Sequence, residues 1–322
     1  MKRREFVVLL GGAAVARPLA VRAQQKAMPV IGFLNGGSAD KFAPYFAAFR
    51  AGLAAKGYVE GQNVAIDYRN AEGHYDRLPT FAAELVQRNV SAIATFSLPA
   101  ARAAKAATTT IPIIFITGAN PVTASLVASF NKPGGNLTGI SMSEQAMAYK
   151  QIETLHEIVP KAEVMGVIVN PTNPFYESIL AGLQAGARVL KIHLSVVRVT
   201  TAQEIDEAFA SVSQQGAGAV VILADALFQD RRDQLVALQN RYSLPLSEFP
   251  RFGGLMGYSA NFPRVFHDLG TYTGRILKGA RPEDLPVEQT TKFEMVINLK
   301  TAQALGLTIP QSVLARADEV IE

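Results

Sequence analysis

The 322-residue sequence contains no cysteine. This absence excludes disulfide bonds, thiol catalysis, and zinc or iron–sulfur sites built on cysteine. The N-terminal region therefore has no cysteine to which a lipid anchor could be attached. A chain of about 300 residues folds without disulfides because it buries a large apolar core. We therefore expect a globular protein without covalent cross-links.

A long apolar run is also absent beyond the N-terminal segment, and so is an excess of charge. The chain has 31 basic and 27 acidic residues. Residues 1–23 hold five of the basic residues and one of the acidic ones, which leaves 26 of each in the remaining 299. No later stretch of about 18 apolar residues is available to span a bilayer. The balance predicts no nucleic-acid partner, and the missing span predicts no membrane anchor.

Residues 1–23 have the pattern of an export signal. Basic residues at 2–4 precede an uncharged, mostly apolar run at 6–16, and a small-residue cleavage pattern ends at Ala23. The pair Arg3-Arg4 resembles a twin-arginine signal, and an ordinary secretory signal that carries two arginines is the alternative. Both routes predict cleavage near Ala23 and a soluble periplasmic product.

Short apolar runs alternate with helical patterns through the rest of the chain, which is typical of βαβ architecture. The predicted strands are 29–34, 64–69, 92–96, 112–117, 137–141, 164–170, 193–199, 219–225, 244–249, 255–259 and 287–299. Their nearly continuous apolar character favours parallel sheets covered on both faces. The pattern pauses at a turn-rich loop, 131–136, and restarts near residue 142. We therefore predict an α/β fold of two doubly wound lobes, each with four or five strands.

Motifs of catalysis are mostly missing. The four histidines lie far apart, and the sequence has no phosphate loop, no dinucleotide fingerprint and no nucleophile elbow. Ser129 and Lys132 match S-x-x-K, but this pair lies in the turn-rich loop and lacks the accompanying motifs. The sequence thus disfavours an enzyme and predicts neither a cofactor nor a metal.

Polar, small and aromatic residues instead follow the carboxyl ends of predicted strands, where open α/β sheets bind ligands. The candidates are Asn35, Gly36, Ser38, Ser97, Leu98, Pro99, Ala100, Asn120, Asn170, Tyr176, Asp225 and Phe228. Turn and cap chemistry alone can explain any one of them. Their shared placement predicts that several face one cleft.

Two of these segments suggest specific roles. Pro99 suits the first turn of a helix, whose free N–H groups and positive dipole end suit a carboxylate. Asp225 ends a buried strand, where it can pair with a ligand ammonium; alternatively it caps the helix that begins near Asp230 or pairs with a neighbouring arginine. Tyr176 and Phe228 offer an aromatic wall, although core packing is the commoner fate of such residues.

Several motifs carry a family resemblance. They are GYVEGQN at 57–63, YDRLP at 75–79, ATTTIP at 107–112, KPGGNLTG at 132–139, GGLM at 253–256, and the segments 293–299, 302–310 and 317–321. In these the chain resembles the ABC-transporter substrate-binding proteins of the tryptophan/tyrosine-uptake-like family. The match covers nearly the whole chain after residue 23.

The resemblance implies a type I periplasmic-binding-protein fold, with two α/β lobes joined by a hinge of three crossovers. Lobe 1 would comprise residues 24–141 and about 260–290, and lobe 2 residues 142–259 and about 291–322. Where the family usually has Asp-Pro-Val, this chain has Asn120-Pro121-Val122. A neutral Asn120 suits a carboxylate, amide or hydroxyl better than an ammonium.

We therefore expect a monomeric periplasmic solute-binding protein that delivers a small organic ligand to an ABC permease in the inner membrane. The ligand would be an aromatic amino acid or a related carboxylate, and Ser97 to Ala100 with Asn35 to Ser38 would contact its anionic end. The alternative is a sensory module of the same fold that feeds a membrane receptor or kinase. A DNA-binding regulator shares the fold, but the export signal and the neutral charge disfavour it.

Overall fold

The computed structural model describes residues 28–322, apart from the side chains at 144–146. The predicted export segment, with its cleavage near Ala23, lies outside the described residues. Within the part of the chain that is described, no helix is both long and apolar enough to cross a bilayer.

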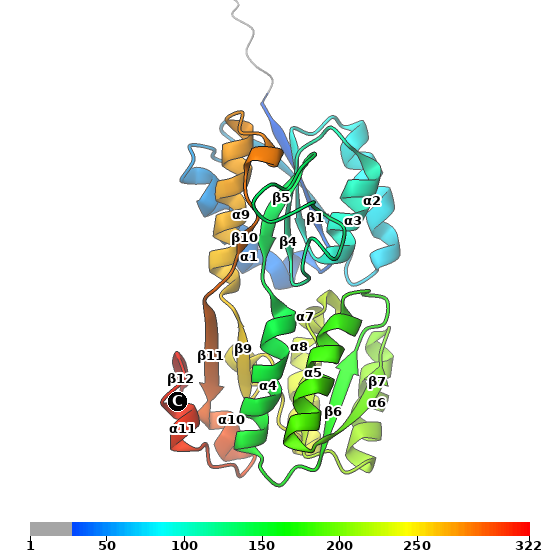
Figure 1. Cartoon of the computed structure of the whole chain (residues 1–322), viewed down its shortest axis with the longest axis vertical. Coiled ribbons are helices and arrows are strands. Elements are labelled where there is room, and N and C mark those ends of the chain that lie inside the picture. The colour runs from blue at the N-terminus through cyan, green and yellow to red at the C-terminus, as the bar shows by residue number, and fades with distance from the viewer. Residues whose placement is uncertain (1–27) are drawn as a thin grey trace, which may run out of the picture.

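One half of the molecule, uppermost in Figure 1, is built on a six-stranded parallel sheet. The sheet has the order β10-β5-β4-β3-β1-β2, with β1 (Val30–Asn35), β2 (Ala65–Asn70), β3 (Ala92–Phe96), β4 (Ile113–Thr117), β5 (Leu137–Ser141) and β10 (Glu288–Gln289). Helices α1 (Ala39–Ala54) and α9 (Phe262–Leu277) cover one face, and α2 (Leu78–Gln87) and α3 (Leu98–Ala107) cover the other. Because both faces are covered, the central strands are buried along nearly their whole length.

The other half contains two three-stranded sheets (Figure 1). The parallel sheet β7-β6-β8 consists of β6 (Val164–Val169), β7 (His193–Arg198) and β8 (Ala219–Ile222). Its helices are α4 (Glu144–Ile158) and α5 (Tyr176–Leu190) on one face, α6 (Ala202–Gln214) and α8 (Arg232–Tyr242) on the other, and the short α7 (Ala226–Asp230) after β8. In the mixed sheet, β9 (Met256–Ala260) is antiparallel to β11 (Phe293–Asn298), which is parallel to β12 (Glu319–Ile321). Short elements complete the chain: η1 (Tyr75–Arg77), η2 (Pro250–Phe252), η3 (Pro282–Asp284), α10 (Leu299–Ala304) and α11 (Gln311–Leu314).

Two predicted strands of this half differ from the structure. Residues 244–249 form only an isolated bridge between Leu246 and Val220. Pro245 accepts a hydrogen bond from Val220 but has no N–H to donate, so the ladder cannot extend. The run 287–299 divides into β10 and β11, because the chain leaves one sheet and enters another within it.

The chain passes between the two halves three times. The passages lie between β5 and α4, between β9 and α9, and between β10 and β11. They fall at 142–143, at Asn261 and at 290–292, close to the lobe limits predicted from the sequence. The limits themselves stay a prediction.

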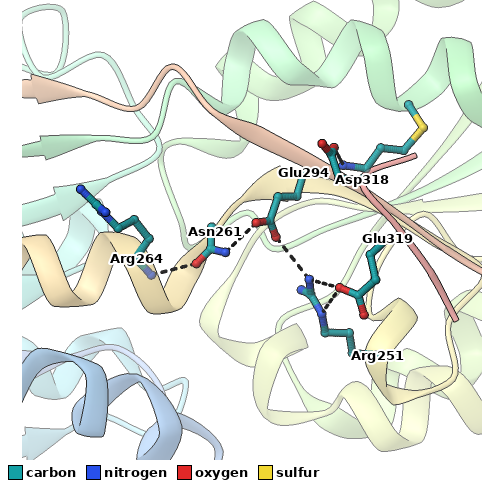
Figure 2. A network of polar contacts seen from close by, with 7 residues as sticks. Arg251, Asn261, Arg264, Glu294, Asp318 and Glu319 are labelled. Carbon is teal, nitrogen blue, oxygen red and sulfur yellow. Dashed lines mark hydrogen bonds and ion pairs between the residues drawn. The ribbon is translucent and has the colours of Figure 1, made fainter. Parts of the chain in front are cut away.

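Polar contacts join the second and third passages, as Figure 2 shows. The Asn261 amide donates to Glu294 at 2.6 Å, and its oxygen accepts the Arg264 N–H at 2.8 Å, which caps α9. Arg251 donates to Glu294 at 3.2 Å and to Glu319 at 2.5 Å. These bonds hold the two chain passages beside each other and connect them to β12.

Candidate ligand-binding site

A cavity of about 120 Å³ lies between the two halves. The residues that follow β3 and β4 line it from the six-stranded half, and the residues that follow β8 line it from the other. Other residues of the wall come from α4, β9 and the segments around them, among them α1, η1, α5, α7 and α9. The carboxyl ends of parallel strands thus meet the cavity from both halves, which is where open α/β sheets bind ligands.

Aromatic side chains form much of the wall. Phe42, Phe96 and Phe262 come from the six-stranded half, and Phe175, Phe228, Phe249 and Tyr258 come from the other half. Several of these rings also contact one another; the centroids of Phe42 and Phe96, for example, are 5.2 Å apart. A wall of this kind suits the ring of an aromatic ligand.

Asp225 accepts four hydrogen bonds at the cavity. Its Oδ1 accepts from the Asn170 amide and from the Leu227 N–H, each at 2.9 Å. Its Oδ2 accepts from the Tyr75 hydroxyl at 2.7 Å and from the Asn173 amide at 3.0 Å. Asp225 also caps α7, which begins at Ala226, and not the helix predicted to begin near Asp230, because α8 begins at Arg232 after Arg231.

Burial controls the protonation of this group. Desolvation raises the pKa of Asp225, and the hydrogen bonds from Asn170 and Tyr75 oppose the rise. Desolvation also raises the pKa of Tyr75 well above its ordinary value, and the nearby charge of Asp225 adds to the effect. The Tyr75 phenol therefore stays protonated at neutral pH and donates to the carboxylate.

A second group of contacts joins α1 to α7 and α8 across the two halves. The Ser38 N–H and hydroxyl both donate to Asp230, at 3.0 and 2.8 Å, and Lys41 forms an ion pair with Asp233. We call these four residues the latch. Burial raises the pKa of Asp230, opposed by the two hydrogen bonds from Ser38. With the Tyr75–Asp225 bond, the latch holds the two halves together beside the cavity.

Two residues that line the cavity have unusual backbone conformations. Ser97 has φ of 96° and Phe249 has φ of 62°, in a region that side chains other than glycine rarely adopt. The Ser97 hydroxyl accepts the Ala100 N–H at 3.4 Å and so caps α3. Backbone strain of this kind concentrates at ligand sites, where the surrounding structure holds it in place.

Four of the twelve residues predicted from the sequence line the cavity: Ser97, Leu98, Asp225 and Phe228. Three more lie directly behind it. Asn170 donates to Asp225, Ser38 belongs to the latch, and Gly36 lies so close to Tyr75 that a Cβ on it would be 2.8 Å from the ring.

The other five predicted residues lie outside the cavity wall. Asn35 donates to Asn70 within the six-stranded half, and Pro99 and Ala100 belong to the first turn of α3. Asn120 is exposed and its side chain caps the turn that follows β4. Tyr176 begins α5 and contacts the adjacent Glu177 at 3.5 Å. Their roles in ligand binding stay predictions.

The twelve predicted residues do not include seven polar residues of the wall: Tyr75, Gln151, Asn173, Gln229, Glu248, Tyr258 and Ser259. Glu248 lies near the end of the predicted strand 244–249, so the strand-end rule would have found it. Asn173 lies in the same turn as Asn170. Tyr75 and Gln151 have no comparable signal, because they approach the cavity from η1 and from the middle of α4.

Comparison with known proteins agrees with this architecture. The tyrosine-binding protein of Clostridioides difficile (strain R20291) is 27% identical over 266 residues, which cover 80% of this chain and 75% of that protein. The structure of an ABC domain in complex with L-Trp from Streptococcus pneumoniae matches with a TM-score of 0.82 and 27% identity. A conserved domain protein from Vibrio cholerae o1 biovar eltor str. n16961 matches with a TM-score of 0.83 and 26% identity. Both structural matches cover 91% of this chain and 99% of the other.

These similarities confirm the predicted type I periplasmic-binding-protein fold. They also agree with the resemblance that the sequence motifs carry. The description "ABC transporter substrate binding protein" applies to residues 28–321, nearly the whole described chain, and the protein belongs to that family.

Proposed function

We propose that the protein captures a small aromatic ligand, an aromatic amino acid or a related molecule, and delivers it to an ABC permease in the inner membrane. Its family is a ligand-binding component of ABC transporters rather than a family of enzymes. The observation that carries the proposal is the cavity between the two halves, with aromatic rings contributed from both. One relative is named a tyrosine-binding protein, and another was solved with L-Trp.

Capture would work by closure of the two halves around the ligand. Ser97 and Leu98 would contact it from one half, and Asp225 and Phe228 from the other. Closure excludes water from the cavity and presents a defined shape to the permease. The polar contacts that join the halves stabilise this closed form, and a ligand that contacts both halves stabilises it further, so ligand binding and closure are coupled.

The proposal also includes the location of the protein. Residues 1–23 would direct export, with cleavage near Ala23, and the mature chain would act as a soluble periplasmic monomer. It would bind no nucleic acid and require no cofactor.

A thermal-shift screen of purified residues 24–322 tests the capture function. The panel contains aromatic amino acids, aromatic carboxylates and purines, with aliphatic amino acids for comparison. A ligand at 100 times its Kd stabilises the folded state by about 2.7 kcal/mol, which raises the melting temperature by several degrees. Calorimetric titration then gives the Kd. If no aromatic compound shifts the melting temperature, the proposal is wrong.

A further inference from the structure

Arg232, the first residue of α8, is a cation at the boundary between the two halves. Its side chain is only 12% exposed, and its Nε is buried with no hydrogen-bond partner among the described residues. Asp233 Oδ1 lies 3.9 Å from this Nε, which is too long for a hydrogen bond, and Asp233 already pairs with Lys41. The described residues thus accept none of the five N–H donors of the Arg232 guanidinium.

The packing around Arg232 fixes its guanidinium but leaves part of it open. The guanidinium carbon lies 3.8 Å from the centroid of the Phe252 ring, so the ring covers one face. Nε is the buried atom without a partner, whereas the two terminal nitrogens still reach the surface. The planar fork of an arginine binds oxyanions such as sulfate and phosphate through paired hydrogen bonds.

Tyr45 faces this region from the other half. It follows Ser38 by seven positions and Lys41 by four, so it lies on the same face of α1 as the latch residues. Its hydroxyl accepts from Gln229 at 3.4 Å, and none of the described residues accepts the proton of that hydroxyl. Burial raises the pKa of Tyr45, and the positive charge of Arg232 is the largest influence that lowers it. The guanidinium therefore lies within electrostatic range of the hydroxyl.

The electrostatic setting of the Tyr45 hydroxyl is positive. Two arginines, Arg232 and Arg251, act on the pKa of Tyr45 against one carboxylate, Glu248, whose influence is smaller than that of either. Arg251 is committed to the two carboxylates with which Figure 2 shows it, whereas Arg232 donates to no described residue. A positive field with an unused donor from each half favours an anion at this position.

We propose that a small oxyanion of the sulfate or phosphate class binds between Arg232 and Tyr45 and bridges the two halves. The terminal nitrogens of Arg232 donate to it from one half, and the Tyr45 hydroxyl donates to it from the other. The site lies beside the cavity and not in it, since neither residue lines the cavity wall. Because each half contributes a donor, the bound anion stabilises the closed form. The inference goes beyond the proposed capture and does not depend on which ligand is captured.

Direct binding of inorganic anions to the unaltered protein tests the proposal. Equilibrium dialysis is carried out with radiolabelled sulfate and then with radiolabelled phosphate, in the absence of any organic ligand. Sodium chloride keeps the ionic strength constant, so that changes in screening do not contribute. At least one of the two anions should occupy a single saturable site.

Two variants test the assignment of this site to its residues. Arg232→Gln removes the charge and the fork, and Tyr45→Phe keeps the ring and removes the hydroxyl. Each should weaken anion binding by about tenfold or more, because each removes a donor to a charged acceptor. The matched controls are Arg188→Gln on the exposed face of α5 and Tyr242→Phe at the end of α8, and both should keep the wild-type Kd.

Each outcome supports or overturns the proposal. If neither anion binds saturably to the unaltered protein, the proposal is wrong, whatever the variants do. Wild-type affinity in folded Arg232→Gln would place the anion elsewhere and overturn the site. A loss in Arg232→Gln without a loss in Tyr45→Phe would overturn the bridge between the halves. The screen of aromatic compounds tests the capture function separately, so failure of one proposal leaves the other standing.

Discussion

At the scale of single residues, Asp225 lies in a setting that disfavours its charged form. Burial raises its pKa, whereas the four hydrogen bonds stabilise the ionised form. Only the Tyr75 bond comes from the other half of the molecule. Tyr75 also accepts the Ala226 N–H at 3.3 Å, so a single hydroxyl joins η1 to both the carboxylate and the first residue of α7.

We expect Tyr75→Phe to weaken ligand binding without unfolding the protein. The substitution removes the one donor to Asp225 that crosses between the halves, and a hydrogen bond to a charged group contributes about 1.5–3 kcal/mol. This corresponds to a loss of affinity of roughly tenfold to 100-fold, which calorimetric titration with the ligand found in the screen measures.

Tyr242→Phe on α8 is the matched control for this prediction. The Tyr242 ring packs against Phe209, and Tyr242 does not line the cavity. The Kd should stay within about twofold of the wild-type value. Equal effects of the two substitutions would show that the bond from Tyr75 to Asp225 does not contribute to capture.

At the scale of elements, α1 and α9 cross at unusually short range. A Cβ on Gly52 would lie 1.9 Å from the His267 carbonyl oxygen, and one on Gly270 would lie 2.1 Å from the Phe49 carbonyl oxygen. The two glycines thus allow the backbones to meet. This contact positions α1, whose N-terminal turn carries the latch residues Ser38 and Lys41.

Gly270→Ala should therefore destabilise the protein, although alanine is the better helix former. Helix propensity favours alanine by about 1 kcal/mol, but the backbone of α1 would have to move, and overpacking costs typically 1–3 kcal/mol or more. Because a Cβ at 2.1 Å meets backbone rather than a flexible side chain, we expect the packing cost to exceed the gain. Urea unfolding measures the net change as a lower midpoint.

Gly274→Ala on the same helix provides the comparison. Its Cβ would lie 2.6 Å from the Lys56 Cβ, a longer distance than the 2.1 Å at Gly270, so a smaller loss is expected. If Gly270→Ala were as stable as Gly274→Ala, the close crossing of α1 and α9 would not be a constraint on packing.

The predicted and observed elements can be compared to see which features a single sequence predicts. The predicted strands 92–96 and 137–141 coincide with β3 and β5, because continuous apolar runs bounded by turn residues define buried strands. Strand ends then gave Ser97 and Asp225 as residues of the cavity. The strand expected at 244–249 formed only the isolated bridge of Leu246 with Val220, because Pro245 has no N–H with which to continue the pairing. Tyr75 and Gln151 could not be found, because their approach to Asp225 and Glu248 depends on how two distant segments meet.

At the scale of the whole molecule, the halves are connected in two ways. Three chain passages join them covalently, and Asn261 with Glu294 ties two of these passages together (Figure 2). The latch and the Tyr75–Asp225 bond join them through noncovalent contacts, each of which involves at least one side chain. Hinge motion would preserve the first set of contacts and break the second. The side-chain contacts should therefore set the balance between open and closed forms.

Asp230→Ala tests this balance, since it removes the acceptor of both hydrogen bonds from Ser38. Asp230 is far less exposed than its latch neighbour Asp233. Loss of its two hydrogen bonds should therefore raise the free energy of the closed form, relative to the open form, by about 1–3 kcal/mol. Without ligand, small-angle X-ray scattering should give a larger radius of gyration than for the wild type. With saturating ligand the two radii should converge, because binding energy restores the closed form. Ligand release, measured by stopped flow, should be faster by at least fivefold.

Asp76→Ala removes an exposed carboxylate that has no partner among the described residues, and it should change neither the radius of gyration nor the rate of ligand release. An Asp230→Ala protein with the wild-type radius and release rate would mean that the covalent passages alone hold the halves in place.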